Sequence, residues 1–218
     1  MSYLDAVRYL ESCVNYENIP SYFYKKVLKL ERIEGFLNLI NNPERDLKCI
    51  HVAGTKGKGS TCAFIAYILR QAGFKAGLYT SPHLIDFRER IRILKPGPRK
   101  MRGLNEFEGM ISKFKLSKLI HRLRPAIEKY NRLSKYGPLS FFEVYTSAAL
   151  IFFKEEGVDF AVLETGLGGR LDATNVVQPL VCAITPISYE HTDKLGHTLK
   201  AIAKEKAGII KKKAIVIS

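Results

Sequence analysis

A glycine-rich segment in the first third of the chain carries the residue types needed to hold a phosphate group. It joins an apolar stretch, residues 48–53, to a helical pattern over Ser60–Gln71. Glycines let backbone N–H groups converge on an anion, and the N-terminus of the following helix adds partial positive charge. Lys58 can reach the outer phosphates of a nucleotide, and a hydroxyl from Ser60 or Thr61 can reach Mg²⁺. The candidate nucleotide-binding residues are Gly54, Thr55, Lys56, Gly57, Lys58, Gly59, Ser60 and Thr61.

The segment departs at two positions from the usual phosphate-binding loop. Val52 stands where that pattern has its first glycine, and Gly59 separates Lys58 from the hydroxyl that usually follows it directly. The alternative is a glycine-rich turn that merely joins a strand to a helix. The apolar strand before the loop and the apolar periodicity after it favour phosphate binding. We therefore predict a site for a nucleoside triphosphate.

Two further polar side chains follow predicted strands. Glu164 ends the apolar stretch 158–163 and is followed by glycines, and His191 comes shortly after the stretch 180–185. Ligands of open α/β sheets collect at the carboxyl ends of strands, where a carboxylate can hold Mg²⁺. The alternatives are a surface carboxylate that caps a turn and a structural or exposed histidine. The glycines after Glu164 and the acidic neighbours of His191 favour a metal site.

The elements that must position these groups alternate along the chain. Strands are predicted over 48–53, 76–80, 90–94, 158–164, 180–185 and 214–217. Helices are predicted over 3–15, 24–41, 60–71, 104–135 (one helix or a pair), 140–156 and 201–210. This alternation predicts an α/β fold, a P-loop-type three-layer domain with a mostly parallel sheet and helices on both faces. A length of 218 residues suits one such domain.

The chain is basic, with a formal net charge of +14. Residues 91–136 hold 13 lysines and arginines against three glutamates. Such a block can mark a nucleic-acid-binding protein. The same region, however, has a helical apolar stripe that includes Phe107, Met110, Phe114, Leu119 and Leu123, so the charges fit its solvated face. It has no zinc-finger spacing or RNA-binding signature, and an attraction for small polyanions explains the sign equally well. Nucleic acid is therefore not an expected partner.

Bulk features also bear on the cellular compartment. No apolar run approaches the ~18 residues that span a bilayer, and the N-terminus lacks a basic region followed by an apolar core. The cysteines Cys13, Cys49, Cys62 and Cys182 are far apart and form no Cys-x-x-Cys pair. These features predict free thiols in a reducing compartment, and thus a cytoplasmic protein with no membrane partner.

Three motifs in order, residues 54–60, 80–84 and 164–175, resemble the folylpolyglutamate synthase/dihydrofolate synthase family. That family is related to the Mur peptidoglycan ligases, and the resemblance covers about residues 30 to 218. It implies that residues 1–218 form a Mur-ligase-like ATP-binding domain with N-terminal helices. The family's smaller C-terminal ligase domain is expected to be missing from this chain, and a monomer is expected.

The resemblance also implies an activity. Family members use ATP to join L-glutamate to a folate-type carboxylate through an acyl phosphate. The acceptor is dihydropteroate, which gives dihydrofolate, or a reduced folate whose glutamate tail is extended. Two alternatives stay open: a Mur-type ligase that acts on a nucleotide-linked sugar acid, and a non-catalytic nucleotide- or folate-binding module or incomplete enzyme.

Matching positions carry the family's site residues over to this chain. The implied catalytic residues are Lys58, His191 and Lys206, and the implied Mg²⁺ ligands are Ser60, Ser81, Glu164 and His191. The implied substrate residues are Ser81, Pro82, His83, Arg88, Phe142 and Asp172. Besides ATP, the implied cofactors are one or two Mg²⁺ ions and a monovalent cation, with carbamylation of Lys206 by CO₂. Lys56 stands where the family usually has Asn, which adds charge beside the triphosphate.

Overall fold

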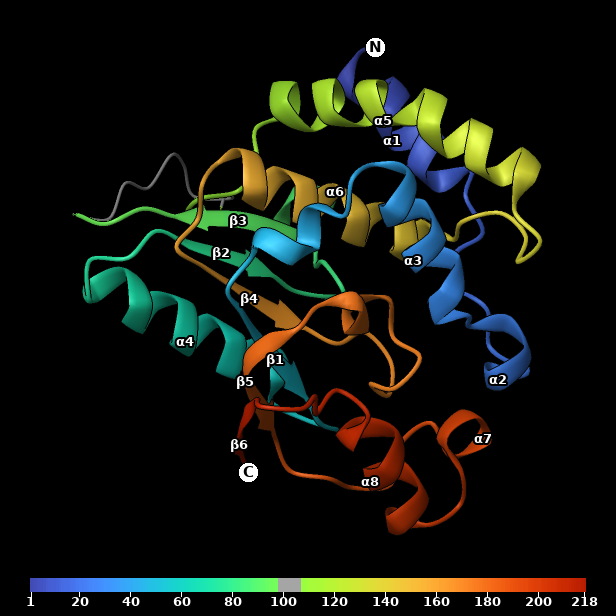
Figure 1. The fold of residues 1–218 in the computed structure, drawn as a ribbon, viewed down its shortest axis with the longest axis vertical. Helices are drawn as coiled ribbons and strands as arrows, with labels where there is room; N and C mark the ends of the chain where they lie inside the picture. Colours follow the sequence, from blue (N-terminus) through green and yellow to red (C-terminus); the bar gives the residue numbers. More distant parts are fainter. Residues whose placement is uncertain (98–106) are drawn as a thin grey trace.

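A computed structural model of the chain describes residues 1–97 and 107–218 (Figure 1). Within these residues, six strands form one sheet in the order β3-β2-β4-β1-β5-β6. The strands are β1 (Cys49–Ala53), β2 (Ala76–Tyr79), β3 (Ile91–Leu94), β4 (Phe160–Glu164), β5 (Pro179–Ile184) and β6 (Ile215–Ile217). All neighbouring pairs are parallel except β2 and β3. The predicted mostly parallel sheet is confirmed.

Helices cover both faces of the sheet, as predicted (Figure 1). On one face α4 (Lys58–Gln71) packs its buried Cys62 and Ala66 against Ile50 and Val52 of β1. The other face is covered by α6 (Phe141–Glu155), and α1 (Tyr3–Glu11), α3 (Leu30–Leu39) and α5 (Lys113–Leu133) pack over it. Because side chains alternate along a strand, neighbouring residues of β1 serve different layers. The domain therefore has three layers.

Helix α6 occupies the middle of one layer, and its sequence explains its position. It is apolar on almost every side, so it must be enclosed by other elements. It begins at a capping box in which the Ser140 hydroxyl accepts from the Glu143 amide and the Glu143 carboxylate accepts from the Ser140 amide. The side chain of Glu143 also pairs with buried Arg32 of α3 at 2.9 Å. These contacts fix the start of α6 beside the sheet edge where the site lies.

Several predicted helix boundaries were wrong. The predicted helix over 24–41 is two helices, α2 (Tyr24–Val27) and α3, because Leu28 and Lys29 adopt extended backbone. Helix α5 begins only at Lys113, where Ser112 caps it, so Phe107 and Met110 do not belong to its stripe. Met110 instead bridges to Arg92 of β3. Residues 98–106, which include parts of the predicted loop and helix, lie outside the described residues.

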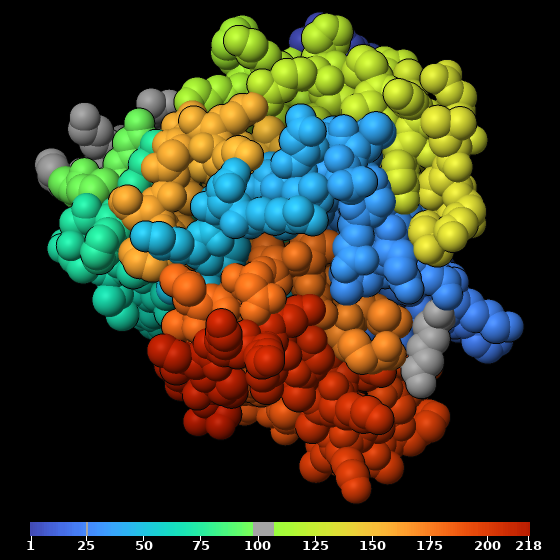
Figure 2. Space-filling model, viewed as in Figure 1, coloured from blue at the N-terminus to red at the C-terminus, as the bar shows by residue number. Residues whose placement is uncertain are grey.

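The C-terminal part of the chain adds α7 (Thr192–Leu195) and α8 (Leu199–Ala207) beside β5. Short 3₁₀ turns, η1 (Pro43–Asp46), η2 (Phe87–Arg90) and η3 (Ala173–Val176), complete the described elements. In the space-filling view, the N-terminal segments, residues near 160–175 and the C-terminal segment meet on one face (Figure 2). The four cysteines are free thiols, and Cys49, Cys62 and Cys182 are buried. Within the described ranges, no helix has the length and apolar composition needed to cross a membrane.

Candidate functional site

The sheet brings the predicted site residues to one edge. Strands β1, β2, β4 and β5 run parallel, so their carboxyl ends lie together. The glycine-rich loop follows β1, Ser81 follows β2, Glu164 ends β4, and the segment with His191 follows β5. Segments separated by more than 100 residues in sequence thereby line one rim.

The loop after β1 has the backbone geometry of an anion site. Gly57 has φ of +80° and stands at the N-cap of α4, where no side chain caps the helix. The first N–H groups of α4 are therefore free of a side-chain cap and available to an anion. A Cβ atom at Gly54 would lie 1.7 Å from Oγ1 of Thr185, so this close approach to β5 requires glycine. The Nζ of Lys58 lies 3.4 Å from the Thr55 carbonyl oxygen, folded back over the loop.

The segment after β5 is tied to this loop. The Thr55 amide donates to the Pro186 carbonyl at 3.1 Å, and the Ser188 amide donates to Oγ1 of Thr55 at 3.1 Å. These bonds hold residues 186–191 beside the phosphate loop. His191, three residues further on, has φ of +48° and begins α7. Burial lowers the pKa of His191, which favours the neutral imidazole that can act as a metal ligand.

Glu164 lies between the phosphate loop and the end of β2. Its Oε2 accepts a hydrogen bond of 3.0 Å from the Ser81 amide, and a Cβ atom at Gly59 would lie 3.3 Å from the same oxygen. Burial raises the pKa of the Glu164 carboxyl, and the Ser81 amide and Lys58 oppose that rise. The Ser81 hydroxyl is buried, and none of the residues that the structure describes forms a hydrogen bond with it. The Glu164 carboxylate thus lies beside both Ser81 and the first turn of α4, which begins at the glycine-rich loop.

The Glu164 carboxylate and the Ser81 hydroxyl are oxygen donors that could hold Mg²⁺. Among residues 1–97 and 107–218, no group of three or more His, Cys, Asp or Glu side chains is arranged to hold a metal ion. Mg²⁺ binds through one or two protein oxygens, keeps several waters and takes further oxygens from nucleotide phosphates. The Glu164 carboxylate and the orphaned Ser81 hydroxyl match that requirement.

Lys206 of α8 reaches the loop from the other side. Its side chain is almost fully buried, and Nζ donates to the Gly54 carbonyl oxygen at 2.6 Å. Burial, with a further contribution from the positive charge of Lys58, lowers the pKa of Lys206 to about 8. An amine with this pKa is partly neutral near pH 7–8 and can react with an electrophile such as CO₂.

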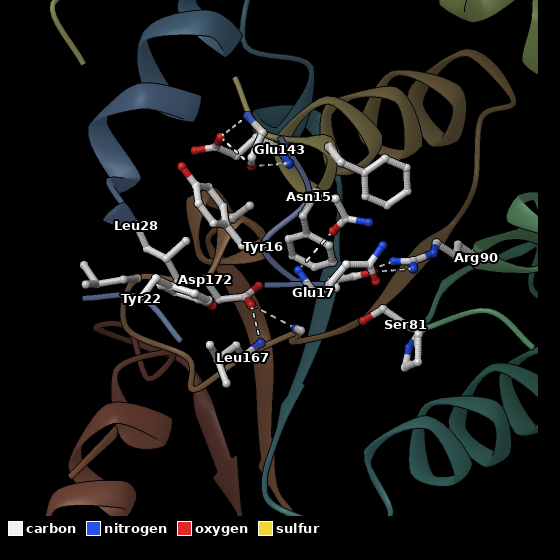
Figure 3. Close-up of a pocket in the computed structure, with 18 of the residues that line it drawn as sticks. Asn15, Tyr16, Glu17, Tyr22, Leu28, Ser81, Arg90, Glu143, Leu167 and Asp172 are labelled. Carbon is white, nitrogen blue, oxygen red and sulfur yellow. Dashed lines mark hydrogen bonds and ion pairs between the residues drawn. The ribbon is translucent and has the colours of Figure 1, made fainter. Parts of the chain in front are cut away.

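A cavity of about 690 Å³ opens next to Glu164 and Ser81 (Figure 3). Its walls come from the N-terminal segment, the loop after β2, the start of α6 and the glycine-rich loop after β4. The predicted residues that line it are Ser81, Pro82, His83, Phe142, Asp172 and His191. Arg88 is not among the lining residues, and its guanidinium pairs with Asp86 and lies over the Tyr3 ring.

Arg90 contributes the guanidinium that Arg88 does not. Its two NH groups donate to both carboxylate oxygens of Glu17 at 2.8 and 2.6 Å, and its Nε donates to Nδ1 of His83 at 3.0 Å (Figure 3). The guanidinium lies over the Phe141 ring at 5.1 Å. Burial and Arg90 lower the pKa of His83, so the imidazole is neutral with its proton on Nε2. This cluster joins the N-terminal segment to the loop after β2.

Asp172 shapes the opposite wall. One carboxylate oxygen accepts from the Gly166 and Leu167 amides at 2.8 and 2.9 Å (Figure 3). The other accepts from the amide and hydroxyl of Thr174. Burial raises the pKa of Asp172, and these hydrogen bonds oppose that rise. The side chain is 3% exposed, so it contributes mainly by holding the loop.

Known proteins similar to this chain include two curated enzymes and a solved structure. No protein-family model matches the chain. The dihydrofolate synthase/folylpolyglutamate synthase of Bacillus subtilis is 42% identical over 183 residues, which cover 84% of this chain and 39% of that protein. The folylpolyglutamate synthase (FPGS) of Lacticaseibacillus casei is 34% identical over 219 residues, with 100% and 46% covered. A solved complex of FPGS with AMPPCP and folate matches with a TM-score of 0.83 at 35% identity, covering 99% of this chain and 48% of that one.

This chain belongs to the folylpolyglutamate synthase/dihydrofolate synthase family. The family predicted from the three motifs is confirmed, and so is the α/β fold class. The chain spans less than half the length of these two curated relatives.

The sequence motifs did not include several residues that line the cavity. The segment between α1 and α2 supplies Asn15, Tyr16, Glu17 and Tyr22 to the cavity (Figure 3). The sequence predicted a helix over residues 3–15, but α1 ends at Glu11, so Asn15 belongs to this segment instead. A run of aromatic and polar residues that breaks the helical periodicity was the available signal.

Proposed function

We propose that residues 1–218 form the ATP-binding domain of a ligase that adds L-glutamate to a folate-type carboxylate. The observation that carries this proposal is the hydrogen bond from the Ser81 amide to Glu164. It joins the phosphate loop, the candidate metal ligands and the 690 Å³ cavity at one sheet edge. A phosphate donor and a carboxylate acceptor bound there would have their reactive groups side by side.

The nucleotide would bind with its triphosphate over the loop of residues 54–61. The N–H groups at the start of α4 and the Nζ of Lys58 would neutralise phosphate oxygens. Lys56 would add a further positive charge nearby. The FPGS structure that matches this chain was solved with AMPPCP, an ATP analogue, which supports ATP as the nucleotide.

The metal would be Mg²⁺, held by Glu164 and Ser81, with Ser60 and His191 as the further ligands that the family resemblance implies. It would supply charge neutralisation for the phosphates during transfer. Carbamylation of Lys206 would turn a buried cation into an anion that can support a second cation. One unpartnered hydroxyl, Ser81 Oγ, supports the first of these sites most directly.

The acceptor would occupy the cavity with its carboxylate toward Ser81. Phe142 and the loop after β4 offer apolar and backbone surfaces to a flat ring system, and His83 offers an N–H donor. The acceptor carboxylate would attack the γ-phosphate to give an acyl phosphate, and the amine of L-glutamate would displace phosphate from it. Lys58 and the loop N–H groups would hold the transferred phosphoryl group in line.

Phosphate release from ATP tests this proposal. We expect release that requires both L-glutamate and either dihydropteroate or tetrahydrofolate, and that disappears in Lys58→Ala. A Mur-type ligase would instead require a nucleotide-linked sugar acid. A binding module would bind Mg·AMPPCP without any glutamate-dependent release, and that result would contradict the ligase.

A further inference from the structure

A histidine in the central strand has no place in the chemistry proposed above. His51 is fully buried in β1, and its Nε2 lies 2.7 Å from Oγ1 of Thr174. Its Nδ1 is buried, and no residue among 1–97 and 107–218 forms a hydrogen bond with it. Burial lowers the pKa of His51 to about 3, so the ring is neutral. An apolar residue would fill this position without the cost of an unpaired polar atom.

The partners of each group determine which atom donates in the series of hydrogen bonds that begins at His51. The hydroxyl of Thr174 contacts both His51 and a carboxylate oxygen of Asp172. Three backbone amides donate to Asp172, which favours its acceptor-only carboxylate form. Since a hydroxyl has one proton, Thr174 donates to Asp172 and accepts from the Nε2–H of His51.

This series of hydrogen bonds ends at the cavity wall. The second carboxylate oxygen of Asp172 accepts from the amides of Gly166 and Leu167, and all three residues line the cavity (Figure 3). Gly166 packs against Phe142, because a Cβ atom there would lie 2.8 Å from that ring. Hydrogen bonds therefore connect this wall to a donor in the strand that precedes the phosphate loop.

We propose that His51 is a positioning residue that sets, through Thr174 and Asp172, the shape of the wall that contacts the acceptor. Removing the His51 donor frees the Thr174 hydroxyl to turn from Asp172, and the Gly166 and Leu167 amides then lose a fixed acceptor. The nucleotide loop is held by other bonds, through Thr55 and Ser188, and keeps its geometry. The identity of the acceptor rests on the proposed function. The link from His51 through Thr174 and Asp172 to the cavity wall does not.

Three variants and one control test the link. His51→Leu removes the donor at similar volume, and His51→Gln keeps an N–H at similar reach. Thr174→Val removes the hydroxyl with little change of shape. Cys49→Ala is the matched control, because Cys49 is also buried in β1 and is two residues from His51, on the same side of the strand.

Backbone amide exchange, followed by NMR, reads the link without any ligand. We expect His51→Leu and Thr174→Val each to speed exchange at Gly166 and Leu167 by about tenfold or more, and His51→Gln to restore much of the protection. The Thr55 and Ser188 amides should exchange as in the parent protein. Equal exchange at Gly166 and Leu167 in His51→Leu and the parent overturns the proposal, as does the same loss in Cys49→Ala.

Ligand binding then reads the consequence. In the proposal, His51→Leu weakens dihydropteroate binding by about tenfold, leaves the dissociation constant for Mg·AMPPCP unchanged, and is not additive with Thr174→Val. Parallel weakening of both ligands contradicts a role in the acceptor wall. A parent protein that binds Mg·AMPPCP but neither dihydropteroate nor tetrahydrofolate refutes the proposed function, while the exchange data still decide the link.

Discussion

The Ser81 amide donates a hydrogen bond of 3.0 Å to Glu164, a residue 83 positions away in the sequence. The bond connects the end of β2 to the end of β4, and the first turn of α4 packs against the same carboxylate at Gly59. Within the described part of the chain no group bonds to the Ser81 hydroxyl, so Ser81 holds the carboxylate through its amide and offers a hydroxyl oxygen beside it. This pairing is the reason to expect metal, phosphate and acceptor in one place.

Glu164→Gln is expected to abolish the effect of Mg²⁺ on nucleotide binding. Glutamine can keep the hydrogen bond from Ser81, but it lacks the charge that attracts Mg²⁺. Titration calorimetry with AMPPCP should show that Mg²⁺ strengthens binding to the parent by about tenfold or more and leaves the variant unaffected. A variant that responds to Mg²⁺ like the parent would remove Glu164 from the metal site.

Lys58→Ala is expected to weaken AMPPCP binding by about 100-fold while the melting temperature stays close to that of the parent. Among the described residues, the Lys58 side chain hydrogen-bonds only to the Thr55 carbonyl oxygen, so the folded state loses little. A buried-site lysine that meets phosphate makes a charge-assisted interaction worth a few kcal/mol. Lys56→Ala, an exposed change in the same loop, is the control and should weaken binding far less. Comparable losses in the two variants would make the effect one of general charge.

Lys206 is expected to form a carbamate whose amount rises with pH. CO₂ reacts with the neutral amine, and a pKa of about 8 means that this form declines about tenfold per pH unit below that value. With ¹³C-labelled CO₂ at fixed pressure, ¹³C NMR should show a carbamate signal that grows from pH 6.5 to 8. Lys204→Ala, an exposed change on α8, should keep the signal, and Lys206→Ala should lose it. A signal that survives Lys206→Ala would assign the carbamate to another lysine.

His51 is expected to reduce stability in acid. Its pKa is about 3 in the folded protein against 6.5 in the unfolded chain, so only the unfolded state takes up a proton between these values. Stability therefore falls as pH drops from 6.5 toward 3, by at most about 1.4 kcal/mol per pH unit from this group. Urea unfolding at pH 4, 5 and 7 should show a shallower dependence in His51→Gln. His197→Gln, which changes an exposed histidine, should retain the parent's dependence, and an identical curve for His51→Gln would refute the assignment.

Glu17→Ala is expected to lower the free energy of unfolding by about 1–3 kcal/mol. The guanidinium of Arg90 is 1% exposed and would lose both oxygens of its carboxylate partner, although Glu17 itself is 30% exposed and partly screened. Glu128→Ala removes the partner of Arg124 from an exposed pair on α5 and should change stability by less than about 0.5 kcal/mol. Unfolding in guanidinium chloride measures both variants. Equal losses of unfolding free energy would show that burial of the Arg90 side chain does not depend on its pairing with Glu17.

The sequence predicted the sheet and the strand–loop–helix unit of β1 and α4 well, because both leave local patterns. Apolar runs of four to six residues followed by glycine or a polar residue are visible without tertiary information, and β1 with its loop is the clearest case. The start of α5 was placed too early because Phe107 and Met110 continue the apolar period by chance. The Met110 backbone instead forms an isolated β-bridge with Arg92 of β3, and the Arg92 guanidinium lies over the Phe107 ring at 5.3 Å; both are tertiary contacts.

The residues that line the cavity were predicted only in part, for a physical reason. Ser81, His83 and Asp172 belong to motifs, whereas Glu17 acts through an ion pair with a residue 73 positions away. Arg88 and Arg90 are two residues apart and equally basic, and only the structure shows which of them reaches the cavity. His51 looked like part of an apolar strand, since its partner Thr174 is 123 residues distant.

The most direct test of the central claim is a mass-spectrometric product assay. The protein would be incubated with Mg·ATP and L-glutamate, with dihydropteroate and tetrahydrofolate offered separately. We expect a product heavier than the acceptor by one glutamyl unit, formed by the parent protein and absent with Lys58→Ala. Folded protein that binds Mg·AMPPCP and both acceptors yet yields no such product would contradict it.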